Sequence, residues 1–133
     1  MRVVVDTNVL ISGLFFGGYP KKILAAILKD EIIATVSLEI LEEYQKVIQR
    51  ISEEYGKDQN QNYNLILPKF KIITPLSNVC LSRDKEDDKF INCAIDSKSL
   101  YIISGDEDLL VLKKVDNIEI ITAKQFCESY LKS

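Results

Sequence analysis

The sequence predicts an α/β protein in which a mostly parallel sheet is covered by helices on both faces. Short β-branched apolar segments alternate along the chain with segments whose apolar residues recur at helical spacing. The first strand, residues 2–6, is apolar at consecutive positions, as is typical of a strand buried on both faces. The chain has 133 residues, 47% of them hydrophobic, which suits one core. We therefore expect a single domain over residues 1–133.

The first half of the chain contains two predicted strands and two predicted helices. A polar pair, residues 7–8, ends the first strand, and the Gly- and Pro-containing segment 17–20 begins a helix. A second strand is expected at 32–36, and Ser37 is a favourable N-cap for a long helix ending near residue 55. The apolar stripes of these two helices are Ile23, Leu24, Ile27 and Leu28, and then Leu38, Leu41, Tyr44, Ile48, Ile51 and Tyr55.

The second half continues the alternation. The polar region 56–64 leads into a short helix near residues 58–67, closed by Pro68. The other predicted elements are strands at 71–74, 101–104 and 118–122, a helix from 88 to about 99, and a last helix at 123–131. This order predicts right-handed βαβ units, in which ligands bind beyond the carboxyl ends of the strands.

Composition limits the chemistry. The chain has no histidine, which excludes a His base and His-liganded metal sites. Its cysteines, Cys80, Cys93 and Cys127, show no CxxC spacing, and we expect reduced thiols. Any hydrolytic chemistry must therefore use carboxylates. The net charge of -3 gives no general basic field, so a nucleic-acid substrate would need a local basic patch or bound metal.

Polar side chains interrupt the apolar run near the N-terminus at Asp6, Asn8 and Ser12. An uninterrupted apolar segment is what a signal peptide or a membrane span requires. We therefore expect no membrane association and a cytoplasmic location.

Four carboxylates are expected to meet at one edge of the sheet. Asp6 ends the first strand and Asp106 follows the fourth, while Asp88 begins a helix in the same region. Glu43 lies at the margin of the buried stripe of the long helix, where it can lean into a cleft. Converging carboxylates repel one another unless cations lie between them, and such oxygen ligands favour Mg²⁺ or Mn²⁺. Bound metal can activate water for phosphodiester hydrolysis without a histidine.

Each residue also has a simpler interpretation. Asp6 is an ordinary residue type at a strand end, and Asp87 and Asp88 are good helix N-caps, with capping favoured for Asp87. Taken alone, Glu43 would face solvent, and residues 106–108 would form a turn or cap a short helix. The joint placement of two strand-end and two helix carboxylates favours the functional interpretation.

Four short segments carry a shared pattern across nearly the whole chain. They are Val4–Leu10, Glu43–Tyr44 in the helix after Ser37, Asp87–Phe90 with Ala94, and Ser104–Leu110. In this order they resemble the PIN-domain family, most closely the single-domain VapC-type ribonuclease toxins of bacterial and archaeal toxin-antitoxin modules. The resemblance implies metal-binding roles for Asp6, Glu43, Asp88 and Asp106, with polar support from Asn8, Ser104 and Asp108.

The resemblance also implies an architecture and partners. It implies a three-layer α/β/α sandwich with about five mostly parallel strands, frequent homodimers, and an antitoxin that covers or enters the acidic cleft. Ser104 stands where the family often carries Thr, and its hydroxyl can make the same hydrogen bond. Residues 56–68 carry no motif that we can place, so the choice of RNA is open.

Three hypotheses follow. The leading one is a Mg²⁺- or Mn²⁺-dependent endoribonuclease that acts as a toxin. A phosphoryl-transfer or phospho-receiver domain is disfavoured, because such a site wants an acidic residue two positions after Asp6, where Asn8 stands. A PIN-like protein that binds RNA or a partner without cutting is the third.

Overall fold

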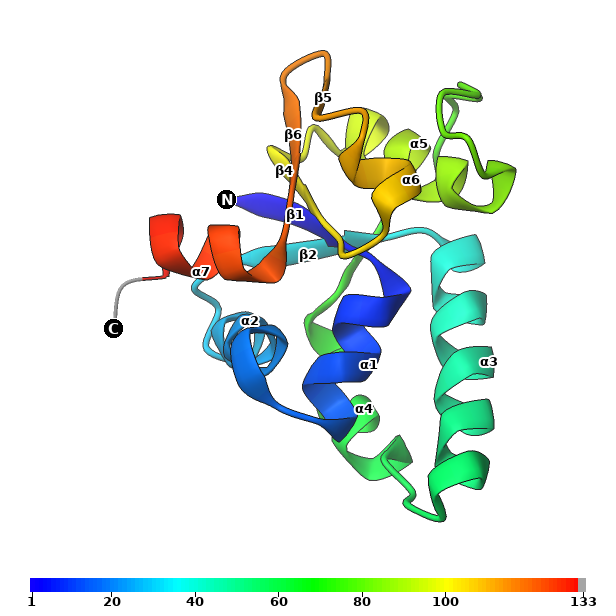
Figure 1. Cartoon of the computed structure of the whole chain (residues 1–133), viewed down its shortest axis with the longest axis vertical. Helices are drawn as coiled ribbons and strands as arrows, with labels where there is room; N and C mark the ends of the chain where they lie inside the picture. Colours follow the sequence, from blue (N-terminus) through cyan, green and yellow to red (C-terminus); the bar gives the residue numbers. More distant parts are fainter. Residues whose placement is uncertain (132–133) are drawn as a thin grey trace.

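A six-stranded sheet lies at the centre of the computed structural model, which describes residues 1–131 (Figure 1). The strands are β1 (Arg2–Val5), β2 (Ile33–Val36), β3 (Lys71–Ile72), β4 (Tyr101–Ile103), β5 (Lys114–Val115) and β6 (Ile118–Ile121). Their order is β3-β2-β1-β4-β6-β5, and every neighbouring pair is parallel except β5 and β6. The mostly parallel α/β fold is confirmed; the short edge strand β5 was not predicted.

Strand β1 lies in the middle of the sheet because its sequence has no polar face. Val3, Val4 and Val5 are all buried, and their β-branched side chains pack against both helical layers. Val5 pairs in register with Ile103 of β4, so the two strands end side by side. The residues that follow each strand are thereby placed next to one another.

Helices cover both faces of the sheet (Figure 1). They are α1 (Thr7–Phe15), α2 (Gly18–Leu28), α3 (Leu38–Tyr55), α4 (Asn60–Ile66), α5 (Asp88–Ser97), α6 (Glu107–Leu110) and α7 (Ala123–Tyr130), with 3₁₀ turns η1 (Leu67–Lys69) and η2 (Lys85–Asp87). Helix α5 packs across β1, β2 and β4, while α1, α2 and α7 lie on the other side of the sheet. Helix α3 contacts both α1 and α5. Within residues 1–131, no helix combines the length and apolar character needed to cross a lipid bilayer.

Helix α1 is the largest departure from the sequence prediction, which placed no helix between β1 and the glycines. It begins at Thr7, directly after β1, and six of its nine residues are buried. An amphipathic pattern is missing because little of the helix faces water. Asp6 occupies the N-cap position yet makes no side-chain capping bond, so the usual start signal is also weak. The missed helix matters because it starts at a candidate site residue.

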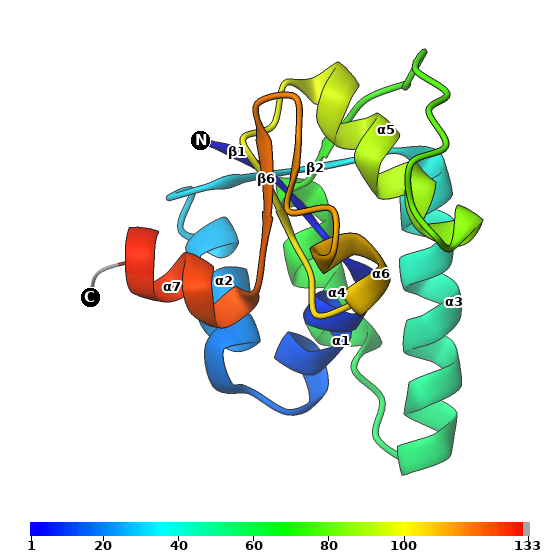
Figure 2. The same ribbon diagram turned by 45° about the horizontal axis from the view of Figure 1, so that its top comes forward.

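An extended segment, residues 76–82, runs beside helix α5 (Figure 2). Three α5 side chains at i, i+4 and i+8 hold it there. Asp96 Oδ2 accepts from the backbone N–H groups of Leu76 and Ser77 at 2.6 and 2.7 Å, and Asn92 Oδ1 accepts from Val79 at 2.8 Å. Asp88 Oδ1 accepts from Leu81 and Ser82 at 3.2 and 2.8 Å. Residues one helical turn apart lie on one face of a helix. This side-chain ladder replaces the strand pairing that the segment lacks and sets the position of the chain that follows it.

Gly13 allows α1 and α2 to approach closely. A Cβ atom at this position would lie 2.7 Å from Leu24 Cδ1 and 2.9 Å from the backbone oxygen of Pro20. Overpacking of this kind costs about 1–3 kcal/mol, whereas replacing Gly by Ala in a helix gains at most about 1 kcal/mol. We therefore expect Gly13→Ala to lower the melting temperature. Gly105→Ala is the control, because no atom lies within 4 Å of its added Cβ; equal melting temperatures would contradict the packing argument.

Candidate metal centre

Asp6 and Asp106 are brought together by the parallel pairing of β1 and β4. The backbone N–H of Asp6 donates to the oxygen of Ile103 at 2.9 Å, which extends the ladder by one residue. The buried Ser104 hydroxyl donates to Asp6 Oδ2 at 2.6 Å and accepts from the backbone N–H of Asp106 at 2.9 Å. Ser104 therefore connects the two strand-end carboxylates.

Asp106 and Asp108 flank the start of α6. Asp106 is its N-cap, and its Oδ1 accepts from the backbone N–H of Asp108 at 2.9 Å. Asp108 Oδ1 forms an ion pair with Arg83 at 3.0 Å, and both side chains are partly exposed. The turn expected at residues 106–108 thus also orients the Asp106 carboxylate, which lies next to Asp6.

Glu43 reaches the cluster from α3, where the helix passes both α1 and α5. Its Oε2 accepts a short hydrogen bond from the hydroxyl of Thr7, the first residue of α1. Its Oε1 lies 2.7 Å from Lys89 Nζ, and the Lys89 side chain is only 4% exposed. Lys89 Nζ also donates to the backbone oxygen of Glu86. Both oxygens of Glu43 are therefore occupied by protein groups.

Asp87 differs from the other carboxylates because part of it is unsatisfied. It occupies the N-cap position of α5 but makes no side-chain capping bond, contrary to the role favoured from the sequence. Within residues 1–131, only two buried side-chain polar atoms lack a hydrogen-bond partner, Ser52 Oγ and Asp87 Oδ2. Buried polar groups are normally paired. A carboxylate oxygen left free in this way can bind a cation.

Asp87 also belongs to a cluster of three carboxylates. Asp84, Asp87 and Asp108 each place one oxygen so that all three lie within 4.8 Å of one another. Asp84 is exposed, Asp87 is buried and Asp108 is intermediate. Oxygen atoms at this separation can share a divalent cation.

The pKa values of two buried carboxyl groups are raised. Burial raises the pKa of Asp6 from 3.8 to about 6; the hydrogen bond from Ser104 opposes this shift. Burial likewise raises the pKa of Asp87 from 3.8 to about 7, and the charges of Asp106 and Asp6 add to it. These shifts show that Asp6, Asp87 and Asp106 act on one another electrostatically.

The structure therefore groups Asp6, Glu43, Asp87 and Asp106, whereas the sequence had named Asp88 in place of Asp87. Asp88 is buried and gives its Oδ1 to the ladder that holds residues 81–82. Asn8 is exposed on the first turn of α1.

Sequence reasoning missed four residues of the centre. They are Thr7, Asp84, Asp87 as a member of the cluster, and Lys89. The adjacent pair Asp87–Asp88 offered two acidic candidates, and no periodic signal distinguishes them at the start of a helix. Asp84 and Lys89 resembled ordinary solvated charges, and only the fold reveals that Lys89 is buried.

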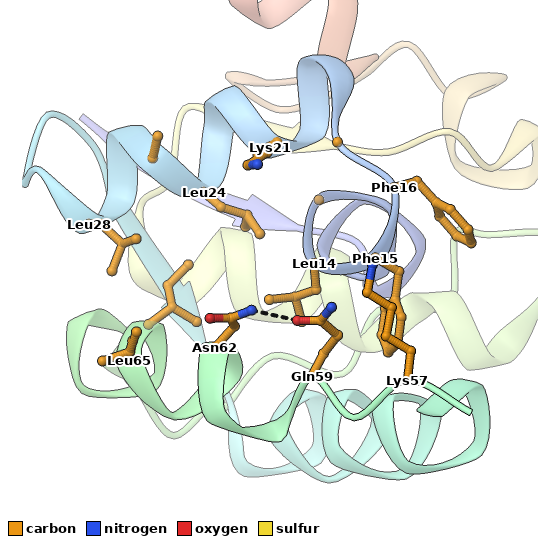
Figure 3. Close-up of a pocket in the computed structure, with 14 residues that line it drawn as sticks. Leu14, Phe15, Phe16, Lys21, Leu24, Leu28, Lys57, Gln59, Asn62 and Leu65 are labelled. Atoms are coloured by element: carbon orange, nitrogen blue, oxygen red, sulfur yellow. Dashed lines mark hydrogen bonds between the residues drawn. The ribbon is translucent and has the colours of Figure 1, made fainter. Parts of the chain in front are cut away.

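A large cavity lies elsewhere in the structure (Figure 3). It has a volume of about 500 Å³ and is bordered by the end of α1, α2 and α4, with Leu14, Leu24 and Leu65 among its apolar walls. Asp6 lies at the opposite end of α1, about 13 Å away along a nine-residue helix. None of the described residues that line the cavity is acidic. It is therefore separate from the metal centre.

Comparison with known proteins identifies the family. The sequence model of the PIN domain matches residues 2–108, which include every carboxylate described above. The chain belongs to the PIN-domain family. A relative, the uncharacterized protein MJ1680 of Methanocaldococcus jannaschii, is 38% identical over 99% of this chain and 93% of its own length. No solved structure gave a significant match.

PIN domains form a nuclease superfamily whose members generally use divalent metals. The acidic centre of this PIN domain fits that requirement by its chemistry. Its donors are hard carboxylate oxygens, and Asp87 supplies a buried oxygen without a partner. Asp87 is the residue that would hold a cation, with the negative charges of Asp106 and Asp6 beside it. The chain thus has the features of a nuclease centre.

The raised pKa values predict that the metal-free protein loses stability as pH rises. Between pH 3.8 and about 6–7, the folded state binds more protons at Asp6 and Asp87 than the unfolded state does. Their contribution is therefore complete at low pH and is lost as pH rises through the folded pKa values. Melting curves from pH 4 to 8 in a chelator should fall less steeply for Asp87→Asn than for the wild type. If the melting temperatures of Asp87→Asn and the wild type fell equally with pH, the raised pKa of Asp87 would be contradicted.

Proposed function

We propose that this PIN domain is a metal-dependent endoribonuclease. The observation that carries the proposal is the buried, unpartnered oxygen of Asp87 next to Asp6 and Asp106. A cluster of charges that burial and mutual repulsion destabilise is retained most readily when it binds a cation. Mg²⁺ and Mn²⁺ match the oxygen donors and the absence of histidine from the sequence.

The residues of the centre have distinct parts in this proposal. A bound divalent metal supplies an activated water and stabilises the charge that develops on the phosphate. Asp6, Asp87 and Asp106 hold the charge that attracts the cation, and Ser104 fixes the orientation of Asp6. Thr7 and Lys89 fix Glu43 at the margin of the site. Arg83, which is partly exposed beside Asp108, is placed to meet an incoming phosphate.

RNA as the substrate rests on the resemblance to VapC-type ribonucleases. The net charge of -3 provides no long-range attraction for a polyanion. Bound metal and Arg83 would have to supply positive charge locally. We therefore expect cleavage to depend on the divalent cation for substrate affinity as well as for chemistry.

A role as the toxin of a toxin-antitoxin pair completes the proposal. In that role the protein acts in the cytoplasm, forms a homodimer and is neutralised by an antitoxin that covers the acidic centre. A gene for a small antitoxin next to its own would support this role.

One observation favours the alternative of a PIN-like protein that binds RNA or a partner without cutting. Protein cations already pair with two of the carboxylates, Lys89 with Glu43 and Arg83 with Asp108. Because these ion pairs already compensate part of the negative charge, the centre depends less on a bound metal ion. A cleavage assay separates the two functions.

Replacing Asp6 by Asn tests the nuclease. Asn keeps the shape and one acceptor oxygen for Ser104 but removes the charge. With mixed RNA and Mn²⁺ or Mg²⁺, we expect cleavage to fall by at least about a hundredfold, because losing even an outer-shell partner of a metal ligand costs about 10–100-fold. The melting temperature should hold or rise, since one of several repelling charges is removed. Wild-type rates from a folded Asp6→Asn protein, checked by circular dichroism, would overturn the nuclease.

The neighbouring pair Asp87 and Asp88 provides a matched comparison. Asp87→Asn removes a charge from the cluster, and we expect it to reduce cleavage as strongly as Asp6→Asn. Asp88→Asn keeps an acceptor oxygen for Leu81 and Ser82, so its cleavage should stay within about tenfold of the wild type. The opposite pattern would restore Asp88 as the metal-binding residue that the sequence indicated.

A further inference from the structure

The two sides of the acidic centre differ in how they are neutralised. On the Glu43 side, Lys89 and Thr7 occupy both carboxylate oxygens, and Lys89 is almost completely buried. The Glu43 side chain is 28% exposed, but the Lys89 ammonium group is buried, so separating the pair would leave that buried charge without its closest partner. The Glu43 side therefore already contains a resident cation that belongs to the protein.

The opposite side contains no equivalent group in the described part of the chain. Asp87 Oδ2 is buried without a partner there, and Asp84, Asp87 and Asp108 place oxygens within 4.8 Å of one another. Among residues 1–131, the only cation paired with these three residues is Arg83, whose side chain is 60% exposed. An exposed ion pair contributes little stability. A divalent cation can therefore displace Arg83 from Asp108.

Asp84 is free to serve as a ligand while it keeps its structural role. It is the N-cap of η2, and its Oδ1 accepts from the backbone N–H of Glu86 at 3.0 Å. A carboxylate has two oxygens, so the other remains available. The ladder on α5 ends at Ser82, two residues before Asp84, and fixes where this segment approaches the cluster.

We propose that the divalent cation binds on the Asp84 side of the centre, with Asp84 as a ligand beside Asp87 and Asp108. At Glu43, the ammonium group of Lys89 supplies the positive charge, so no metal ion binds there. This inference rests on the proposed metal-dependent nuclease and specifies where its metal is held. Glu43 then serves as a positioning residue that links α1, α3 and α5.

Calorimetric titration with MnCl₂ tests Asp84 without an activity readout. Asp84→Asn keeps an acceptor for the Glu86 N–H, so the fold should be unaffected. We expect its Mn²⁺ affinity to fall by about tenfold or more. Glu107→Gln is the matched control: it removes one negative charge from an exposed residue between Asp106 and Asp108, and its affinity should fall much less. Equal losses in the two variants would overturn the role of Asp84 as a ligand.

A charge-neutral double substitution tests the Glu43 side. Replacing the ion pair by Glu43→Gln with Lys89→Met removes both charges together, which avoids leaving either one buried alone. The proposal predicts a Mn²⁺ affinity within about threefold of the wild type, well short of the loss expected for a ligand. A tenfold loss in a folded double variant would overturn the resident-cation role of Lys89.

The same titrations distinguish this inference from the proposed function. A wild-type protein that binds no Mn²⁺ would overturn the metal-dependent nuclease itself. Wild-type binding with an unchanged Asp84→Asn affinity would overturn only the placement of the cation.

Discussion

The hydrogen bond from Ser104 to Asp6 is the contact on which the rest of the centre depends. It lies where β1 and β4 end side by side, and parallel pairing alone brings together residues almost a hundred positions apart. The Ser104 hydroxyl offsets part of the free-energy cost of burying Asp6. It also accepts a hydrogen bond from the backbone N–H of Asp106. Asp106, Glu43 and Asp87 all lie close enough to act electrostatically on the carboxylate that this contact positions.

Helix α5 combines structural and chemical tasks along its length. Its first turns carry Asp88 and Lys89, one directed to the backbone of residues 81–82 and the other to Glu43. Farther along, Asn92 and Asp96 hold the same extended segment. Asp88 and Lys89, about 100° apart around the helix axis, thus reach different neighbours.

Much of the fold could be predicted because the strands are short, β-branched and regularly spaced by helices. The placements of Asp6 and Asp106 followed from strand ends, which any parallel sheet collects at one edge. Helix α1 escaped prediction because it is buried on most sides and lacks a capping side chain. Asp87 was assigned to capping and Asp88 to the site because sequence spacing does not indicate which way side chains in the first turn of a helix point. Lys89 could not be recognised, since burial of a lysine depends on three elements that meet only in the fold.

The ladder on α5 constrains how this protein can vary in length. The accepting side chains Asp88, Asn92 and Asp96 are four residues apart, about 6 Å along the helix axis. Each accepts from the backbone N–H of a different part of residues 76–82, which fixes the register between the helix and this segment. The bonds to Leu76, Val79 and Leu81 are made by the backbone, and Leu76 is 91% exposed, so a substitution at Leu76 other than proline leaves them intact. The Ser77 hydroxyl also donates to Asp96 Oδ1 at 2.7 Å. An insertion or deletion of one residue would shift the segment by about 3.3 Å. Evolution or design can therefore change the exposed residues of this segment, such as Leu76, more easily than its length, because a change in length would move Asp84 relative to α5.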